Sequence, residues 1–259
     1  MIKNAFRIPL VIGAAALAMT SAAGQSQPCT APALICRAGA NQDRSLYVRD
    51  HSKYTQKMRV ERFKVKGTEE QMEEDRETEV RVEPASQPDK SGQVPVITRV
   101  ISDTDKHGKL KSKVDENAKT LLSFGAVMDL AFFPLLPEKI KYYDFQEVVA
   151  GRKNEKWFSF TPKPQETEEP LASGVVELDP ETAEVLTIKI DGLHNLDKLD
   201  KEAARLRSFY ATIDYSQFEG ALRMPTLASG GGVSEITRFH GSFRFHFEEG
   251  KYILVDKVD

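Results

Sequence analysis

Histidine and cysteine are the residue types of this chain best suited to bind metals or to act as nucleophiles and bases. The histidines are scattered along the sequence, and His240 and His246 share one face of a predicted strand. Six residues of a strand span about 20 Å, so a single metal ion cannot bind both. The chain has two cysteines, Cys29 and Cys36, which excludes a four-cysteine zinc or iron–sulfur site. We therefore expect no metal ion and no cofactor.

Catalytic motifs are also absent from the sequence. It contains no H-E-x-x-H, G-x-S-x-G or phosphate-loop pattern. The glycines at 230–232 lack a following Lys-Ser or Lys-Thr and precede a predicted strand, so we interpret them as a flexible loop. Acidic pairs such as Glu69-Glu70 are typical of solvated residues, although the two carboxylates of a glycosidase meet only in the fold. No constellation for a hydrolase is visible, and we predict that the protein is not an enzyme.

The overall composition is that of a chain that can bury a core. It has 259 residues, of which 40% are hydrophobic and 29% are charged, and these values are typical of a globular protein. The 36 Lys and Arg residues nearly balance the 39 Asp and Glu residues, for a net charge of -3. A chain with this balance has no basic field for a polyanion. We expect no nucleic-acid partner.

Residues 1–24 have the pattern of a secretory signal peptide. Lys3 and Arg7 give a positive start, residues 8–18 are an apolar run, and small residues follow at 20–24. The apolar run is shorter than the roughly 17–25 residues of a membrane span, although an uncleaved N-terminal anchor is the alternative. No later stretch is comparably apolar. We therefore expect export, with no transmembrane segment after cleavage.

Residues 25–50 form a mixed lead-in that we expect to be poorly structured or to hold a short helix. In an oxidising compartment Cys29 and Cys36 can pair, because the loop between them is short enough to close. Two free thiols are the alternative. The remaining residues, 51–259, are predicted to form a single β domain.

From Tyr54 onward, apolar and polar residues alternate with the period of a β-strand. Residues 57–61 alternate on one parity and Phe63 and Val65 on the other, which predicts a bulge. The strongest alternation is at 239–247, where phenylalanines occupy one face and polar side chains the other. Further strands are predicted at 80–82, 94–101, 142–149, 157–161, 175–178, 185–190, 209–215, 222–224 and 252–255.

A different pattern interrupts the strands at 115–133. Apolar residues there fall at helical spacing, and Pro134 and Pro137 follow, so the segment predicts one apolar helix. Residues 193–206 could be a helical segment or a charged loop. Turns or loops are expected at 84–93, 103–113, Pro225, 230–232 and 249–250.

Short connections make most neighbouring strands antiparallel. We therefore predict a mainly β fold of about 9–11 strands, forming an antiparallel, strongly curved sheet or unclosed half-barrel. One-sided alternation leaves one face of the sheet dry, and a dry face needs a cover. A second sheet or closure into a barrel could supply it. We expect the apolar helix to cover the concave face.

The C-terminal half carries a recognisable pattern of strands and turns. The segment W-F-S-F-T-P-K-P is followed by G-V-V-E-L-D-P-E-T-A-E-V-L-T-I-K, then by F-Y-A-T-I-D-Y-S-Q-F-E-G-A-L-R-M-P-T-L and R-F-H-G-S-F-R-F-H-F. Over residues 140–259, and more weakly from residue 54, it resembles bacterial outer-membrane lipoprotein-sorting proteins and periplasmic lipoprotein carriers. The resemblance implies export to the periplasm of a bacterial cell envelope. It also implies an unclosed antiparallel barrel whose concave face, under a helical lid, holds acyl chains. No position matches a carrier's functional arginine, so no site residue is carried over.

Side chains on the predicted dry face and at the end of the helix form a candidate apolar site for a lipid or a lipidated protein. One alternative is that the same side chains fill a solid core. Another is an envelope protein that binds a protein partner through a sheet edge or the charged hairpin at 66–82. The oligomeric state is not predicted. The candidate residues are Leu121, Leu130, Phe132, Phe133, Phe158, Phe160, Ile188, Phe209, Ile213, Tyr215, Phe243, Phe245 and Phe247.

Overall fold

The structure of the chain is a computed structural model that describes residues 29–66, 69–85, 96–112, 125–149, 155–218, 220, 222–236 and 239–255. The predicted signal peptide at 1–24 lies outside the described residues, as do the first part of the predicted helix and its candidate residue Leu121.

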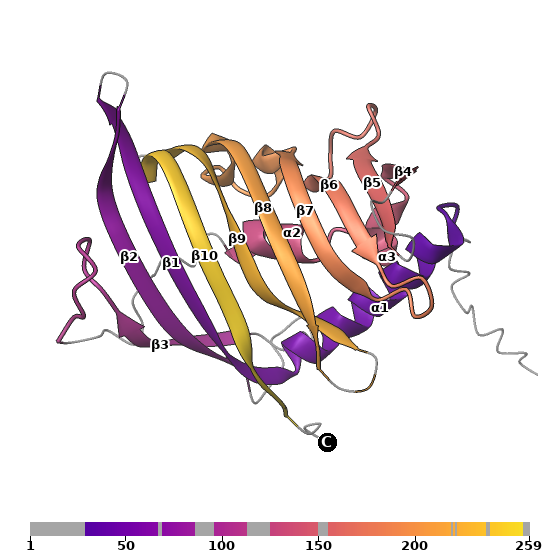
Figure 1. Cartoon of the computed structure of the whole chain (residues 1–259), viewed down its shortest axis with the longest axis horizontal. Coiled ribbons are helices and arrows are strands. Elements are labelled where there is room, and N and C mark those ends of the chain that lie inside the picture. The colour runs from indigo at the N-terminus through magenta and orange to yellow at the C-terminus, as the bar shows by residue number, and fades with distance from the viewer. Residues whose placement is uncertain are drawn as a thin grey trace, which may run out of the picture.

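The described strands form one antiparallel sheet of 10 strands, in the order β3-β2-β1-β10-β9-β8-β7-β6-β5-β4 (Figure 1). The edge strands β3 and β4 do not pair with each other, so the sheet is an unclosed half-barrel, as predicted. The strands are β1 (Ser52–Lys66), β2 (Glu69–Pro84), β3 (Val96–Asp103), β4 (Tyr143–Val148), β5 (Lys156–Pro162), β6 (Leu171–Leu178), β7 (Val185–His194), β8 (Leu206–Gln217), β9 (Arg223–Ile236) and β10 (Phe239–Leu254).

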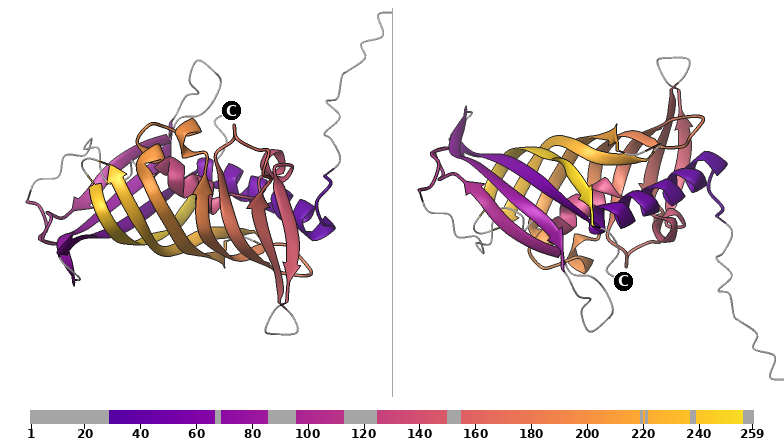
Figure 2. Two further views of the ribbon diagram at one scale, coloured as in Figure 1. Left: turned by 90° about the horizontal axis from the view of Figure 1, so that it is seen from above. Right: turned by 90° about the horizontal axis from the view of Figure 1, so that it is seen from below.

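Helices lie on the concave side of this sheet (Figure 2). Because β3 and β4 are at opposite edges, the chain between them has to cross one face of the sheet. It crosses the concave face and forms α2 and α3 on the way, next to α1 from the N-terminal segment. The helical elements are α1 (Ala33–Asp50), α2 (Gly125–Phe132), α3 (Pro137–Ile140) and the short 3₁₀ turns η2 (Leu196–Lys198) and η3 (Ala203–Arg205).

The bulge lies in β2 and not in β1, where it was predicted. Phe63 follows Arg62 directly in its pairing with β10, whereas Glu73 of β2 is left over between the β2 partners of these two residues. Phe63 therefore lies on the face opposite to the buried Val60. The guanidinium of Arg244 covers its ring, 4.5 Å from the centroid, and buries it there.

The glycines at 230–232 are not a loop, and the break predicted at Pro225 is also wrong. Strand β9 runs through both, between β8 and β10 in the sheet. A Cβ on Gly230 would lie 2.0 Å from a carbonyl oxygen of β8, and one on Gly232 would meet another at the same distance. The rings of Phe243 and Phe245 occupy the space above these glycines. Glycine is used here for close approach of strand and ring, not for a turn.

A second predicted turn, at 249–250, is wrong for a related reason. Strand β10 is continuous, and its register with β1 shifts between the pairs Lys53–Ile253 and Thr55–Gly250. Lys251 has a positive φ of 59° inside this irregularity. The turn-like composition therefore makes a β-bulge within one strand, and it does not separate two strands.

The lead-in predicted at 25–50 contains an 18-residue helix, α1. Its buried residues recur every third or fourth position, as on one face of a helix. Three of them, Gln42, Ser45 and Arg49, are polar. This face carries too few apolar residues to give a visible hydrophobic period, which explains why the sequence predicted at most a short helix here.

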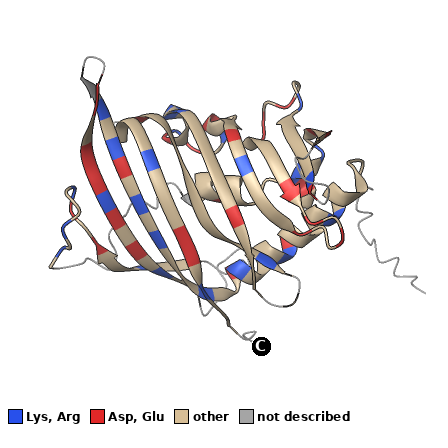
Figure 3. Cartoon of the chain, in the orientation of Figure 1, with Lys and Arg blue, Asp and Glu red and all other residues tan. Residues whose placement is uncertain are grey.

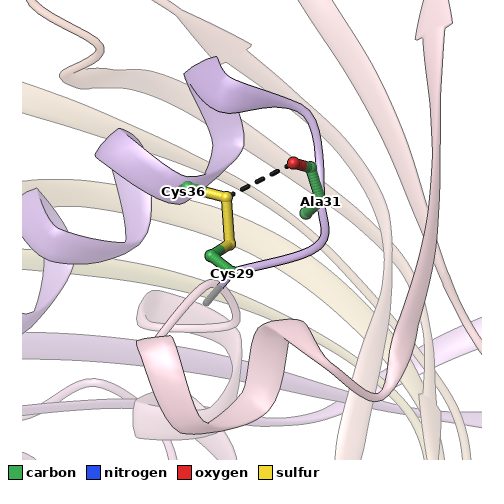
Figure 4. Close-up of a disulfide and its surroundings, with 3 residues drawn as sticks. All are labelled: Cys29, Ala31 and Cys36. Carbon is green, nitrogen blue, oxygen red and sulfur yellow. Dashed lines mark hydrogen bonds between the residues drawn. A yellow bond between two sulfur atoms is a disulfide. The ribbon is translucent and has the colours of Figure 1, made fainter. Parts of the chain in front are cut away.

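A disulfide joins Cys29 to Cys36 at the start of α1, with 6.0 Å between the Cα atoms (Figure 4). Helix α1 has no side-chain N-cap, and the backbone N–H of Cys36 donates to the carbonyl oxygen of Pro32. The disulfide therefore closes a small loop around the first turn of the helix.

The described end of the predicted apolar helix is α2, which stops at Phe132 before Pro134. Pro137 does not simply follow a helix, because it opens α3 in the first-turn position that suits proline. The ambiguous segment 193–206 holds η2 and η3 and no longer helix.

Charged residues are concentrated along β1 and β2 (Figure 3). Lys57 and Arg59 of β1 flank the buried Met58, so their side chains lie on the convex face. Arg59 contacts Asp75 at 2.8 Å, and Lys57 contacts Glu77 at 3.0 Å. Such exposed pairs contribute about 0–1 kcal/mol each. Their main effect is to keep this face in water while the opposite face is buried.

The glycines of β9 give the first prediction. Gly230→Ala should lower the free energy of unfolding by about 1–3 kcal/mol, because the added methyl has to displace the backbone of β8. Gly250→Ala is the matched control, since nothing lies within 4 Å of its added Cβ. Urea unfolding followed by circular dichroism compares them, and equal stability of the two variants would contradict this account of β9.

Candidate functional site

The candidate residues from four strands and α2 come together on the concave side. All of them except Leu121 are buried members of one hydrophobic cluster. Phe245 lies opposite Val60 on one side and Gly230 on the other, and Ile213 lies opposite Ile188. Cross-strand neighbours of this kind share a face of the sheet. The described members are Leu130, Phe132, Phe133, Phe158, Phe160, Ile188, Phe209, Ile213, Tyr215, Phe243, Phe245 and Phe247.

Aromatic rings make the closest contacts within this cluster. Phe209 stacks on Phe245 across the glycines of β9, with 5.6 Å between the ring centroids. Phe132 of α2 contacts Phe247 of β10 at 5.2 Å. These are the separations at which aromatic pairs attract one another, so α2 is held to the sheet by ring contacts.

Among the described residues, side chains nearly fill the interior between Met128 of α2 and the sheet. The cavity there has a volume of about 10 Å³ and is lined by Met58, Val60, Met128, Phe209, Phe239, Phe243 and Phe245. Sites for small molecules usually measure about 300–1,000 Å³. The part of the interior that these residues line is therefore a filled core in this conformation.

A buried ionic cluster lies at one end of the apolar interior. Arg49 of α1 donates to both carboxylate oxygens of Glu249 on β10, at 2.7 and 3.1 Å, and to Asp129 of α2 at 2.8 Å. Gln56 and Tyr252 also donate to Glu249. The Glu249 side chain is 0% exposed and that of Asp129 is 53% exposed. Arg49 thus connects its own helix, α1, both to α2 and to strand β10.

The ionisation of the cluster follows from its burial. Burial disfavours the charged guanidinium, but the carboxylate of Glu249 outweighs that effect and raises the pKa of Arg49. Burial raises the pKa of Tyr54 and of Tyr252. Arg49 therefore stays charged, and the Tyr252 hydroxyl keeps the proton that it donates to Glu249.

A second polar contact fixes the C-terminal end of α2. Gln42 of α1 donates from Nε2 to the carbonyl oxygen of Phe132 at 3.1 Å and accepts at Oε1 from the backbone N–H of Leu135 at 2.9 Å. The hydroxyl of Tyr215 donates to the same Phe132 carbonyl. The last carbonyls of a helix need such partners when they are buried. Helix α2 is thus connected to α1 at both Asp129 and Phe132.

These polar residues were missed by the sequence reasoning, although a signal was present. Gln56 shares its parity with Met58, and Glu249 shares its parity with Phe247, so both lie on the apolar faces of amphipathic strands. Polar residues at buried positions need partners. No comparable signal identified Arg49, because the sequence does not show which face of the helix in the lead-in is buried.

The hydrolase alternative finds no support in the described residues. Ser173 donates to Asp191 at 2.6 Å and also contacts Nε2 of His194 at 3.0 Å. A serine nucleophile requires the histidine between the serine and the acid, whereas here the serine lies between them. Within the same described residues, no cluster of His, Cys, Asp and Glu could hold a metal ion.

No family model and no curated protein matches the sequence. Among solved structures, a LolA superfamily protein from Nitrosomonas europaea is 9% identical with a TM-score of 0.29, over 85% of this chain and 94% of that one. An outer membrane lipoprotein-sorting protein domain from Vibrio parahaemolyticus is 11% identical with a TM-score of 0.33, over 86% and 95%. MucB in complex with MucA(peri) is 10% identical with a TM-score of 0.21, over 82% and 94%.

The resemblance to lipoprotein-sorting proteins that the sequence predicted is thus found again among solved structures. At these TM-scores no residue of those proteins is matched to a residue of this chain, whose fold is defined by its own strand order. Across the described ranges, no helix has the length and hydropathy needed to cross a membrane.

The ionic cluster gives the second prediction. Arg49→Met should lower the free energy of unfolding by about 3–5 kcal/mol, because it leaves Glu249 buried without a cation. Asp129→Asn should cost about 0–1 kcal/mol, because that carboxylate is half exposed. Urea unfolding measures both. Restored stability in Arg49→Met/Glu249→Met would support the pairing, and similar losses in the two single variants would argue against it.

Proposed function

We propose that this protein is a non-enzymatic, exported carrier-like protein that binds the acyl chain of a lipid or lipidated protein between the concave sheet face and α2. The observation that carries the proposal is the apolar concave face, continuous from β1 to β5, under a separate short helix. Because α2 is not part of the sheet, it can leave this face without breaking any strand pairing. Leu121 and the described candidate residues are proposed to line the chain-binding surface.

Exchange of α2 for a ligand is energetically reasonable. A helix of eight residues is unstable by itself, so its contacts with the sheet and with α1 keep it in place. An acyl chain on the same surface would bury apolar area, which contributes about 25 cal/mol per Å². This free energy replaces much of the burial free energy that is lost when α2 leaves the sheet. Met58 and Met128 line the interior and adapt their shape easily.

Export supports the same proposal. The charged start and apolar run of residues 1–24 fit a signal peptide, and a disulfide between Cys29 and Cys36 suits an oxidising compartment. We propose cleavage after the signal and a mature chain whose residues 51–259 form the carrier domain.

The test is titration with a fluorescent fatty acid, together with mass spectrometry of lipids extracted from protein purified from an envelope fraction. Wild-type protein should bind the fatty acid, and Asp129→Asn should take it up several-fold faster because α2 is released from Arg49. Asp144→Asn, an exposed carboxylate on β4, is the matched control and should behave as wild type. Absence of binding to both wild type and Asp129→Asn, with no lipid extracted, would overturn the proposal.

A second candidate function is binding of a protein partner along β3. In the described part of the sheet β3 has one neighbour, β2, and Val96, Ile97 and Ile101 are 47%, 43% and 43% exposed. Unpaired edges with exposed β-branched residues are places where another strand can add.

A photo-cross-linking residue at position 97 tests the second candidate, with one at the inner-strand position 187 as control. A discrete cross-linked protein from position 97 alone would support it. If neither position cross-links in protein that binds the fatty acid, the proposal of a protein partner along β3 is rejected and the proposed carrier function is unaffected.

A further inference from the structure

The two edge strands of the described sheet differ in how well they are protected against further pairing. Strand β4 carries the exposed carboxylates Asp144 and Glu147 on its two faces, and charges of this kind commonly block an edge. On β3, by contrast, Val96, Ile97 and Ile101 are exposed. The β3 edge is therefore the one that favours addition of another strand (Figure 1).

The open part of the β3 edge is short. After Asp103 the chain turns back, and the backbone N–H of Lys111 donates to the carbonyl oxygen of Asp103 at 3.0 Å. A bridge between Thr104 and Leu110 continues this pairing. Residues 109–111 thus cover the end of the edge, and the part of β3 that has no described neighbour on its outer side is residues 96–102.

Two arginines lie opposite each other beside this open edge. Arg81 of β2 is the cross-strand partner of Arg99 on β3, and both are exposed. Arg81 lies between the buried Val80 and Val82, so the two arginine side chains share the convex face. Like charges directly opposite each other in a sheet are destabilising.

Neither guanidinium forms a hydrogen bond or an ion pair with a described residue. Glu79 and Glu83 lie two positions from Arg81 along β2, a separation of about 7 Å in a strand, and Glu79 is attracted to Lys57 of β1. Arg99 has no acidic residue at the corresponding positions of β3, which are isoleucines. The positive charge next to the open edge is therefore left for a group outside the described residues to compensate.

From these observations we infer that residues 96–102 of β3 bind an acidic extended segment of another protein. The segment adds to the sheet as a further strand, with a carboxylate on the convex face beside Arg99 and Arg81. Its backbone N–H and C=O groups pair with those of the β3 edge. The inference rests on the second candidate function, binding along β3, and names the chemistry of the partner.

The charges also argue against two other occupants. If β3 of a second copy of this chain paired antiparallel about the middle of the open edge, Arg99 would lie opposite Arg99 of that copy, and like charges at that position repel. An anionic membrane surface would attract the guanidiniums, but lipid head groups would not form a ladder with the backbone groups of the edge. An acidic strand satisfies both the charge and the backbone.

The experiment measures the fluorescence anisotropy of labelled peptides titrated with the full chain. The probes are the peptide T-V-E-V-E-V-T and two counterparts in which glutamine or lysine replaces both glutamates. Wild type should bind the glutamate peptide about two- to fivefold more tightly than the glutamine peptide, and the lysine peptide most weakly. The preference should shrink at high salt, because the charges are exposed.

Charge reversal is the sharpest variant. Arg99→Glu should invert the order, so that the lysine peptide binds most tightly, whereas Arg99→Lys should keep the order of wild type. Arg81→Gln should narrow the difference between the peptides. Arg44→Gln, which removes an exposed arginine of α1, is the matched control and should behave as wild type. Thermal melting checks that each variant is folded.

A methylated peptide separates strand addition from simple charge attraction. N-methylation of alternate backbone nitrogens in the glutamate peptide keeps its charge but removes the donors of one edge. This peptide should lose binding if it is methylated on the edge that faces β3. Unchanged affinity of both possible methylated forms would overturn the inference.

The outcomes distinguish this inference from the functions proposed above. Equal affinity of wild type for the three peptides would overturn the acidic preference and leave a partner along β3 in place. Dimerisation of wild type with cross-links between two copies at position 97 would also overturn it. If no peptide binds and position 97 captures no protein, both the inference and the second candidate function are rejected, whereas fatty-acid binding and the carrier function are unaffected.

Discussion

An open sheet with one apolar face has to keep that face out of water, and the rest of this structure follows from that constraint. The edges β3 and β4 are far apart, so strand pairing cannot close the concave side. The chain covers the face with its own crossing segment and with α1. Burial of apolar surface contributes about 25 cal/mol for each Å². On the concave face this contribution therefore depends on helices that are not part of the sheet.

The helices are held by polar groups as much as by apolar ones. Arg49 and Gln42 both lie on the buried face of α1, and each contacts α2. A purely apolar contact would allow the two helices to slide along each other, because dispersion forces have little directional preference. Hydrogen bonds and an ion pair fix their register instead, and no buried side-chain N or O atom of the described residues lacks a partner.

Most strands could be predicted from the sequence. One face of the sheet is exposed to water and the other is buried, so polar and apolar residues alternate along each strand, as at 239–247. The length and the buried face of helix α1 could not be predicted, since Gln42, Ser45 and Arg49 occupy the positions where apolar residues would reveal a period. The glycines of β9 have the composition of a loop, and only neighbouring rings show that they belong to a strand. The aromatic part of the candidate site follows from parity, whereas the pair of Arg49 and Glu249 joins residues 200 positions apart.

The pairing of β1 with β10 has a consequence for how the chain assembles. The first and the last of the described strands lie side by side inside the sheet, where they join a block of three strands, β3-β2-β1, to a block of seven, from β10 to β4. The two blocks cannot pair until β10 has formed, and contacts so distant in sequence form slowly. During that delay the apolar faces of both blocks are open to aggregation.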